Sequence, residues 1–459
     1  MKEILIISLL GIVVLALDVL KMRKLVLPVT VIGLLGLIGV SIADWGLNEI
    51  PFAQYGGMLQ FDQTALSFTI IFAFIALFWF ILAGDSYSAG SSQRTDIFAL
   101  VLFSLCGAVV LSAYTNLVML FLGVEILSIP VYVLAASDRK NVLSNESGFK
   151  YFFLGSLASA ILLFGISLTY GAVGSFNLDA LQQHLSGGTY SPLALAGAAL
   201  MLVGFCFKIF VAPFHLWAPD VYQGAPTSIT AYMATIVKGA AFAGMYKLFG
   251  SALLPLPEAF TAALVFMAGL TLIASNLMAV VQSNTKRMLA FSSISHAGFM
   301  LGFVLAASTT PVKYLIFYTL TYSTASLISF FVVQQVAAIQ QNDDTLNAFK
   351  GLIKRSPAMA ISLTVALLSM AGIPPLSGFL AKYYVISNMV RTDHMALVII
   401  MILTSAIGAV YYLRVIAAVF TPIENAGRIM ISDRMRRTMV VLSALLVVFF
   451  FAASLLELL

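Results

Sequence analysis

The sequence predicts an all-α polytopic membrane protein. Of its 459 residues, 61% are hydrophobic and only 9% are charged, and the mean hydropathy is +1.03. A water-soluble domain is usually about 45–50% apolar and about 25% charged, so that class is excluded. The apolar stretches are near the roughly 20 residues that cross a bilayer, and they lack the two-residue alternation of a membrane barrel. Helices are then the way to satisfy every backbone group in lipid.

Fourteen apolar runs follow one another along the chain. They are Ile4–Leu20, Leu25–Ile42, Ala65–Ala83, Ile97–Ala113, Leu117–Ala136, Phe152–Val173, Leu193–Val211, Ile229–Leu248, Phe260–Val281, Leu289–Ala306, Val312–Val336, Met359–Ile386, Met395–Val419 and Met439–Leu456. The first run has the length of a signal peptide, but a basic cluster follows it and no small-residue cleavage site does, so we expect it to be retained. No connecting segment is long enough for a soluble catalytic domain, and none carries a Walker loop.

The basic residues of the loops fall mainly on one side of the predicted bundle. Sorted into alternate loops, fifteen Lys and Arg lie on one side and four on the other. The side richer in Lys and Arg is normally cytoplasmic, so both termini are expected outside. The net charge of +5 does not indicate a nucleic-acid partner, because the charges sit singly between apolar runs.

Two ionisable residues, Glu125 and Lys238, lie deep inside apolar runs, and Lys208 joins them if its run extends past Val211 to about Pro219. Each costs about 2.5–3.5 kcal/mol at the bilayer centre on insertion scales, so a functional role is the favoured interpretation. Lys238 is tenth in a run of twenty that shows no break, which makes snorkelling to the interface geometrically poor. For Lys150 and Arg414, near the ends of runs, a structural ion pair or a snorkelling side chain remains an equal alternative.

Two runs are interrupted by proline, and a lysine lies close to each interruption. Pro213 follows Lys208 by five residues, and Pro374-Pro375 precedes Lys382 by seven. Proline removes a backbone donor and breaks a helix, and broken helices beside buried charges are typical of ion sites in transporters. The matching positions predict two inverted five-helix repeats. The expected organisation is 1–96 for three N-terminal helices, 97–250 for the first repeat, 258–420 for the second, and 421–459 for a cytoplasmic loop and the final helix.

The row Glu125, Lys208, Lys238 and Lys382 is chemically suited to passing protons, because burial brings neutral and charged lysine closer in free energy. His215 and His296 could connect a hydrogen-bonded chain between them, although a hydrogen-bonded interior histidine without such a role is the alternative for His296. The cysteines Cys106 and Cys206 lie in separate apolar runs, and we expect packing roles and no metal site.

Three longer motifs carry a resemblance to a known family. They are FKIFVAPFHLWAPDVYQGAPT at 207–227, NTKRMLAFSSISHAG at 284–298 and GIPPLSGFLAK at 372–382. Through these motifs the chain resembles the antiporter-like subunits of respiratory complex I and of multisubunit sodium–proton antiporters, over most of its length. The resemblance implies fourteen helices with inverted repeats and proton translocation across a bacterial inner membrane, driven by quinone reduction elsewhere in the assembly.

The resemblance also implies roles for the buried residues. Lys208 matches the pumping lysine and Glu125 its carboxylate partner, Lys238 the central relay, and Lys382 the lysine on the exit side. Lys150 and His215 match auxiliary positions of the same axis. Lys382 departs from the M-type subunits, which typically carry glutamate there, and the last run ends too near the C-terminus for the lateral helix of the L-type.

The implied cofactors, NADH, FMN, iron–sulfur clusters and quinone, belong to the rest of the complex, because this chain shows no site for them. The chain is then part of an enzyme only as a subunit of NADH:quinone oxidoreductase. The implied partners are the other membrane subunits, namely a neighbouring M-type and a small K-type subunit, together with the lipid bilayer. Two alternatives remain: a subunit of a cation/proton antiporter without electron transfer, and a membrane scaffold whose buried charges only pair.

Overall fold

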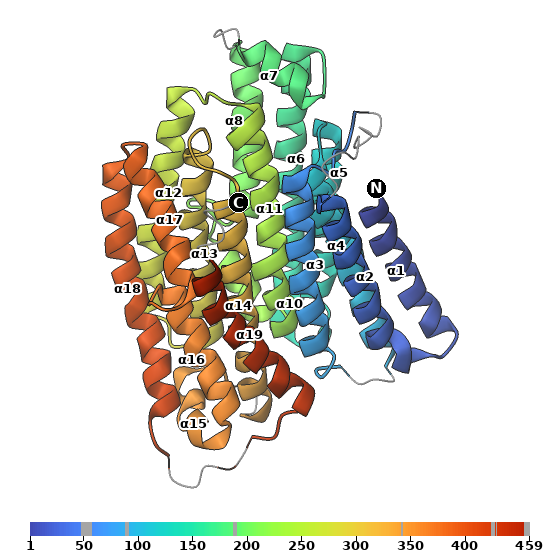
Figure 1. Cartoon of the computed structure of the whole chain (residues 1–459), viewed down its shortest axis with the longest axis vertical. Coiled ribbons are helices and arrows are strands. Elements are labelled where there is room, and N and C mark those ends of the chain that lie inside the picture. Colours follow the sequence, from blue (N-terminus) through green and yellow to red (C-terminus); the bar gives the residue numbers. More distant parts are fainter. Residues whose placement is uncertain are drawn as a thin grey trace.

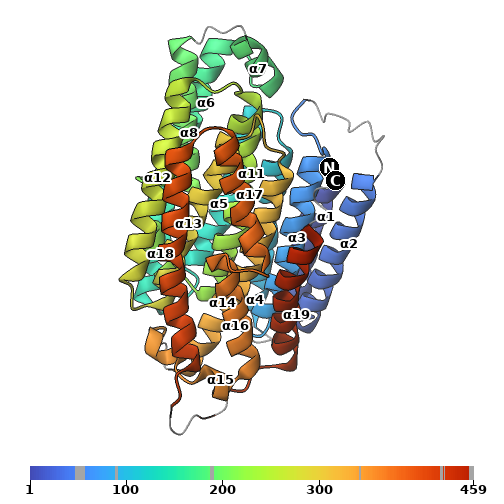
Figure 2. The same ribbon diagram turned by 60° about the vertical axis from the view of Figure 1, so that its left-hand side comes forward.

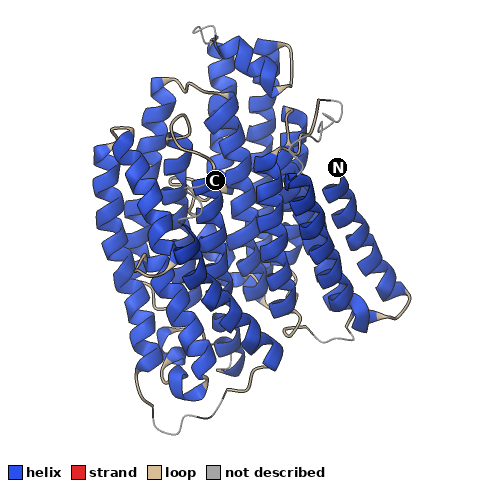
Figure 3. Cartoon of the chain, viewed as in Figure 1, coloured by secondary structure: helices blue, strands red, loops and turns tan. Residues whose placement is uncertain are grey.

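The computed structural model describes residues 1–46, 57–87, 91–186, 191–340, 343–423, 427 and 429–453. Within these ranges every regular element is helical, and only isolated β-bridges join the loops (Figure 3). Two details of the sequence analysis lie outside the described residues: Arg428, one of the fifteen loop cations, and Leu456, the end of the last run.

The helices are as follows: α1 Lys2–Val19, α2 Val26–Gly46, α3 Gln63–Ala83, α4 Ser92–Ala113, α5 Leu117–Ala135, α6 Val142–Val173, α7 Leu178–Ser186, α8 Pro192–Lys208, α9 Ala218–Gly224, α10 Thr227–Tyr232, α11 Lys238–Lys247, α12 Glu258–Val280, α13 Thr285–Leu305, α14 Lys313–Ile339, α15 Leu352–Arg355, α16 Pro357–Ala371, α17 Ser377–Arg391, α18 Met395–Phe420 and α19 Asp433–Ala452. Short 3-10 turns cover Arg23–Leu25 and Leu346–Phe349, and π-helical segments Met233–Val237 and Leu248–Ala252 flank α11.

The predicted spans are confirmed by these helices. Ten helices in the described residues are long and apolar enough to cross a membrane by themselves. α1 occupies the first predicted run and α8 the seventh, and the remaining two runs are composite, built from α10 and α11 with their π segments and from α16 with α17. Several helices begin before their predicted runs. The largest difference is at α6, which begins at Val142, ten residues before the predicted Phe152, because Asn141 caps the helix through Leu143 N and the polar residues 144–150 join its first turns.

The two proline-broken helices run in opposite directions. In Figure 1, α8 starts beside α7 at the top of the bundle, whereas α16 starts beside α15 at the bottom and leads to α17. This antiparallel placement agrees with inverted repeats, whose residue boundaries stay a prediction. In Figure 2 the start of α1 and the end of α19 both lie away from the end of the bundle that holds α15.

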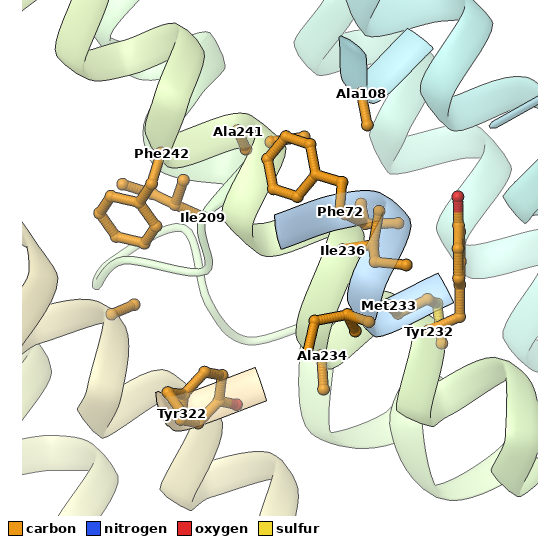
Figure 4. Packing of buried hydrophobic residues seen from close by; sticks show 14 of the residues in the cluster. Phe72, Ala108, Ile209, Tyr232, Met233, Ala234, Ile236, Ala241, Phe242 and Tyr322 are labelled. Carbon is orange, nitrogen blue, oxygen red and sulfur yellow. The ribbon is translucent and has the colours of Figure 1, made fainter. Parts of the chain in front are cut away.

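The centre of the bundle is formed by α10, α11, α13 and α14. In the most apolar stretches of α13 and α14, 94% and 89% of the residues are buried. The corresponding share is 33% for α2 and for α19, whose outer faces carry exposed apolar side chains. Figure 4 shows this centre, with Phe72 of α3 next to Ile236 and with Ile209 next to Phe242. Cys106 and Cys206 are buried free thiols, as predicted.

Candidate functional site

Lys208 is the last residue of α8, directly before the break. Its side chain is 6% exposed, and its Nζ donates to Ser128 Oγ at 3.1 Å and to Tyr132 OH at 2.9 Å, both on α5. The backbone then leaves the helical path until α9 begins at Ala218, and the Ala212 N–H, freed from helix bonding, donates to Thr271 Oγ1 at 2.9 Å. The predicted helix break at Pro213 is therefore confirmed, with Lys208 at its edge.

Glu125 does not form the direct ion pair with Lys208 that the resemblance implies. No carboxylate lies within 4.0 Å of Lys208 Nζ among the described residues, and the buried Oε1 of Glu125 has no hydrogen-bond partner there. Residues three and seven positions apart lie on one face of a helix. Glu125 is thus one turn of α5 away from Ser128 on the face that Lys208 contacts.

The break itself holds polar atoms without protein partners. His215 is buried, and neither its Nδ1 nor Trp217 Nε1 has a hydrogen-bond partner within the described part of the chain. Buried polar atoms without protein partners commonly bind water. His215 therefore lies in a place suited to hydration, about midway along the break.

Lys238 is fully buried at the start of α11, in a run that stays helical, as predicted, but changes its helix type. A π-helical segment, Met233–Val237, directly precedes it. Such a bulge often marks a functional site, and it contains neither proline nor glycine to signal it in the sequence. Lys238 Nζ donates to the carbonyl oxygen of Ser293 and to Ser293 Oγ, the latter at 2.5 Å, and lies 4.9 Å from the centre of the Tyr322 ring.

His296 lies beyond Ser293 on α13 and contacts three tyrosines. Its Nδ1 is 2.7 Å from Tyr318 OH, its Nε2 is 3.4 Å from Tyr412 OH, and its ring centre is 4.6 Å from that of Tyr322. Tyr322 OH also donates to Ser293 Oγ at 2.9 Å. Lys238 and His296 are therefore linked through Ser293 and Tyr322.

A cavity of about 10 Å³ continues from His296 toward the second broken helix, and its lining includes Ser369 and Gly378. That volume is close to the space of one water molecule. On its far side, Lys382 Nζ donates to the Ala371 carbonyl at 3.0 Å and to Ser405 Oγ at 2.9 Å. The predicted interruption at Pro374-Pro375 is confirmed, since α16 ends at Ala371 and α17 begins at Ser377.

Lys208 and Lys238 are connected less closely than Lys238 and His296. Phe210, two residues after Lys208, lies with its ring centre 5.4 Å from Lys238 Nζ. No hydrogen-bonded chain joins the two lysines through side chains of the described residues. The predicted residues thus follow one another across the bundle in the order Lys208, Lys238, His296 and Lys382. The apolar ring of Phe210 separates the first two.

Lys150 takes part in a charged cluster at the edge of α6. It forms ion pairs with Glu146 at 2.7 Å and with Asp220 at 3.1 Å, and Arg287 bonds the same Asp220 at 2.7 Å. Glu146, Lys150, Asp220 and Gln223 line a cavity of about 160 Å³. Lys150 therefore forms ion pairs, whereas Arg414 is exposed and donates to the Val280 carbonyl.

Lys286 is a buried cation that the sequence analysis missed. It was counted among the loop cations, yet it is 5% exposed and donates to the carbonyl oxygens of Gln223 at 3.0 Å and Ala225 at 2.5 Å. Nearby, burial raises the pKa of the Asp344 carboxyl, and the charge of Lys286 partly offsets that shift. The position of Lys286 within the motif at 284–298 is the only sequence signal that could have indicated its burial.

The described residues contain no group of three or more His, Cys, Asp or Glu side chains that could hold a metal ion. The chemistry available along the row of buried lysines is that of amines, hydroxyls, the imidazoles of His215 and His296 and the carboxylate of Glu125. These groups can bind and release protons.

Comparison with known proteins identifies the class. Residues 114–408 match the family described as NADH:quinone oxidoreductase/Mrp antiporter, TM, a range that includes every buried lysine of the axis. The chain belongs to this family of membrane subunits.

Within the family the chain groups with the proteins named NADH-quinone oxidoreductase subunit N. It is 41% identical to that of Cytophaga hutchinsonii over 92% of this chain and 91% of the relative, and 36% identical to that of Chloroflexus aggregans over 85% and 82%.

Solved structures agree. Respiratory complex I from Thermus thermophilus contains a chain 32% identical, with a TM-score of 0.84 over 99% of this chain and 98% of that one. The Mrp complex from a Dietzia species matches at a TM-score of 0.87 over 99% and 95%, but at 19% identity, which shows a shared fold alone.

Proposed function

We propose that this chain, as a membrane-arm subunit of NADH–quinone oxidoreductase, translocates protons through Lys208, Lys238, His296 and Lys382, with Glu125 as the acidic group near the first lysine. The observation that carries the proposal is the arrangement of three buried lysines between two broken helices, each bonded to neutral oxygen atoms. A buried lysine bonded to hydroxyls and carbonyls has no fixed counter-charge, so its protonation can follow a charge that approaches or withdraws.

The drive for this movement comes from outside the chain. NADH, FMN, iron–sulfur clusters and quinone act in other subunits of the complex, and this chain supplies the membrane path. Its neighbours in the membrane are other antiporter-like subunits, of which an M-type and a small K-type are the proposed contacts. The complex lies in the bacterial inner membrane.

The orientation follows from the charges. The loops beside α15 and between α1 and α2 belong to the side with fifteen cations, and that side is cytoplasmic. The charged cluster around Asp220 then faces the cytoplasm, where its cavity of about 160 Å³ could supply protons to the first break. Both termini face the periplasm.

A cation/proton antiporter subunit is the second candidate, and the shared fold with the Mrp complex is what favours it. The greater identity to subunit N proteins and to complex I makes it the weaker of the two. A native gel of gently solubilised membranes, stained for NADH dehydrogenase activity and probed for this chain, separates them. Co-migration with the active band is expected, and a band free of redox activity would contradict the proposal.

Lys208→Met tests the path itself, because methionine keeps much of the volume and removes the amine. NADH-driven proton pumping, normalised to NADH oxidation, should fall by about tenfold or more, as expected when a proton-transfer group is lost. The amount of complex on the native gel should stay constant. Arg414→Met, at an exposed position on α18, is the matched control. Loss of assembly with Lys208→Met would instead support the scaffold interpretation.

A further inference from the structure

One face of α5 offers Lys208 two kinds of partner: two hydroxyls, which it contacts, and a carboxylate, which it does not. Ser128 and Tyr132 hold its Nζ at 3.1 and 2.9 Å. Glu125 lies on the same face, about one 5.4 Å helical turn from Ser128, with its buried Oε1 unbonded among the described residues. A lysine has a flexible four-carbon stem, so a change of rotamer suffices to move Nζ between these partners.

The two kinds of partner respond differently to the charge of the amine. A carboxylate only accepts hydrogen bonds, so Glu125 selects the charged ammonium. A hydroxyl both donates and accepts, so Ser128 and Tyr132 can accept from an ammonium and can also donate to the lone pair of a neutral amine. The hydroxyl pair is therefore a partner for both protonation states of Lys208, whereas the carboxylate is a partner for one.

Tyr132 is held firmly in this position. Its ring packs edge-on against Tyr151 of α6, with centres 4.6 Å apart, and its hydroxyl fits over Gly155, where an added Cβ would lie 2.3 Å from the oxygen. Lys208 is constrained on the other side, since its Cα ends α8 and Phe210 follows in the left-handed region at a φ of +63°. The fixed elements are thus the two backbones and Tyr132, and the movable element is the lysine side chain.

Building on the proposed function, we infer that Ser128 and Tyr132 are positioning residues that hold Lys208 away from Glu125, in the place where it can exchange its proton. At the two hydroxyls the ammonium of Lys208 gives one proton up toward Lys238, and the neutral amine regains one proton from the cytoplasmic side. Each cycle therefore moves one proton and returns the amine to its starting charge.

The test combines Ser128→Ala with Tyr132→Phe, because phenylalanine keeps the ring that packs against Tyr151. We expect the assembled amount of complex to be unchanged and NADH-driven pumping per NADH to fall by about threefold or more, the scale of one or two lost hydrogen bonds. Tyr151→Phe is the matched control, since it removes a hydroxyl from the same aromatic cluster that does not bond Lys208, and its pumping should match the parent.

A structural measurement makes the inference independent of activity. In a cryo-electron microscopy map of the purified complex, the double variant should show Lys208 Nζ within ion-pair distance of Glu125, whereas the parent should show it at Ser128 and Tyr132. Unchanged pumping, or a lysine that stays away from Glu125 in the double variant, would overturn the inference. If Lys208→Met itself pumps normally, the proposed function fails; if only the double variant pumps normally, the inference alone fails.

Discussion

The two broken helices hold their lysines in different ways. Lys208 ends the helix before its break and is bound by side chains of another helix, the hydroxyls of α5. Lys382 follows its break and is bound by the break's own backbone, through the Ala371 carbonyl that ends α16. The first site therefore depends on side chains of another helix, whereas the second combines a carbonyl of its own segment with Ser405 Oγ of α18.

The two breaks also differ in how closely a glycine is packed near each of them. Replacing these glycines gives the largest expected effect among the predictions. A Cβ on Gly378 would lie 1.8 Å from the carbonyl oxygen of Ser369, within the second broken helix, whereas a Cβ on Gly224 would lie 2.4 Å from that of Leu143 on α6. Backbone oxygens cannot move aside cheaply, so Gly378→Ala should cost at least about 3 kcal/mol and remove the chain from the assembled complex.

Immunoblots of native gels measure this loss. Gly224→Ala should also reduce assembly, but less, because α6 is a separate helix that can shift. Gly269→Ala is the control, since its Cβ would meet only the end of Ile400 at 3.3 Å. If Gly378→Ala assembles better than Gly224→Ala, the second break is not the more rigid of the two.

Lys382→Met should give the next largest effect. We expect pumping per NADH to fall by about tenfold or more while assembly is kept, because in the proposed path the amine carries the proton, and the backbone of the break remains. Ser405→Ala, which removes only one acceptor, should have a much smaller effect because the Ala371 carbonyl remains. Equal losses in both variants would show that hydroxyls matter as much at the second break as at the first.

The breaks themselves could be predicted from the sequence, because proline has a direct steric effect on a helix. Pro213 and Pro374-Pro375 each interrupt a helix as expected. The π segment before Lys238 could not, because its residues, Met-Ala-Thr-Ile-Val, are compatible with an ordinary helix and only tertiary packing selects the bulge. Depth within a run correctly indicated that Lys208 and Lys238 are buried.

The hydrogen-bond and ion-pair partners of the buried residues were harder to predict than their positions in the helices. Tyr132 and Ser128 are ordinary polar residues of an apolar run, and their contact with Lys208 depends on how α5 and α8 rotate against each other. Lys286 was assigned to a loop because it adjoins Arg287 and a polar stretch, but the early start of α13 at Thr285 draws it into the protein. Asp220 was not considered, since its two basic partners lie on distant helices.

His296→Gln tests whether His296 connects the two breaks. Glutamine can still bond a tyrosine, but it cannot take up a proton on one nitrogen while releasing one from the other, as imidazole can. Pumping should fall by about threefold to tenfold, less than for a lysine, because Tyr318 and Tyr412 remain. His184→Gln on α7 is the control, and both variants are compared by NADH-driven pumping in membrane vesicles. No loss would leave His296 as a structural residue.

Asp220→Asn should have the smallest effect on proton pumping, and that effect should arise at the first break alone. It removes ion pairs to Lys150 and Arg287 whose side chains are 29–40% exposed, and such pairs contribute about 0–1 kcal/mol. Pumping should change by less than about twofold, and the difference should shrink in high salt. Asp433→Asn, which breaks the exposed pair with Arg436, is the control. A large, salt-independent loss would place Asp220 in the proton path.

Lys238 lies between the lysines of the two broken helices in the proposed path. The most direct test of that path is therefore Lys238→Ala in an otherwise intact complex. Its amine is fully buried and bonded to Ser293 on the central α13. Pumping per NADH oxidised, measured in vesicles with the amount of complex determined on a native gel, should fall by about tenfold or more with assembly retained. Unchanged pumping in fully assembled complex would contradict a path through the buried lysines.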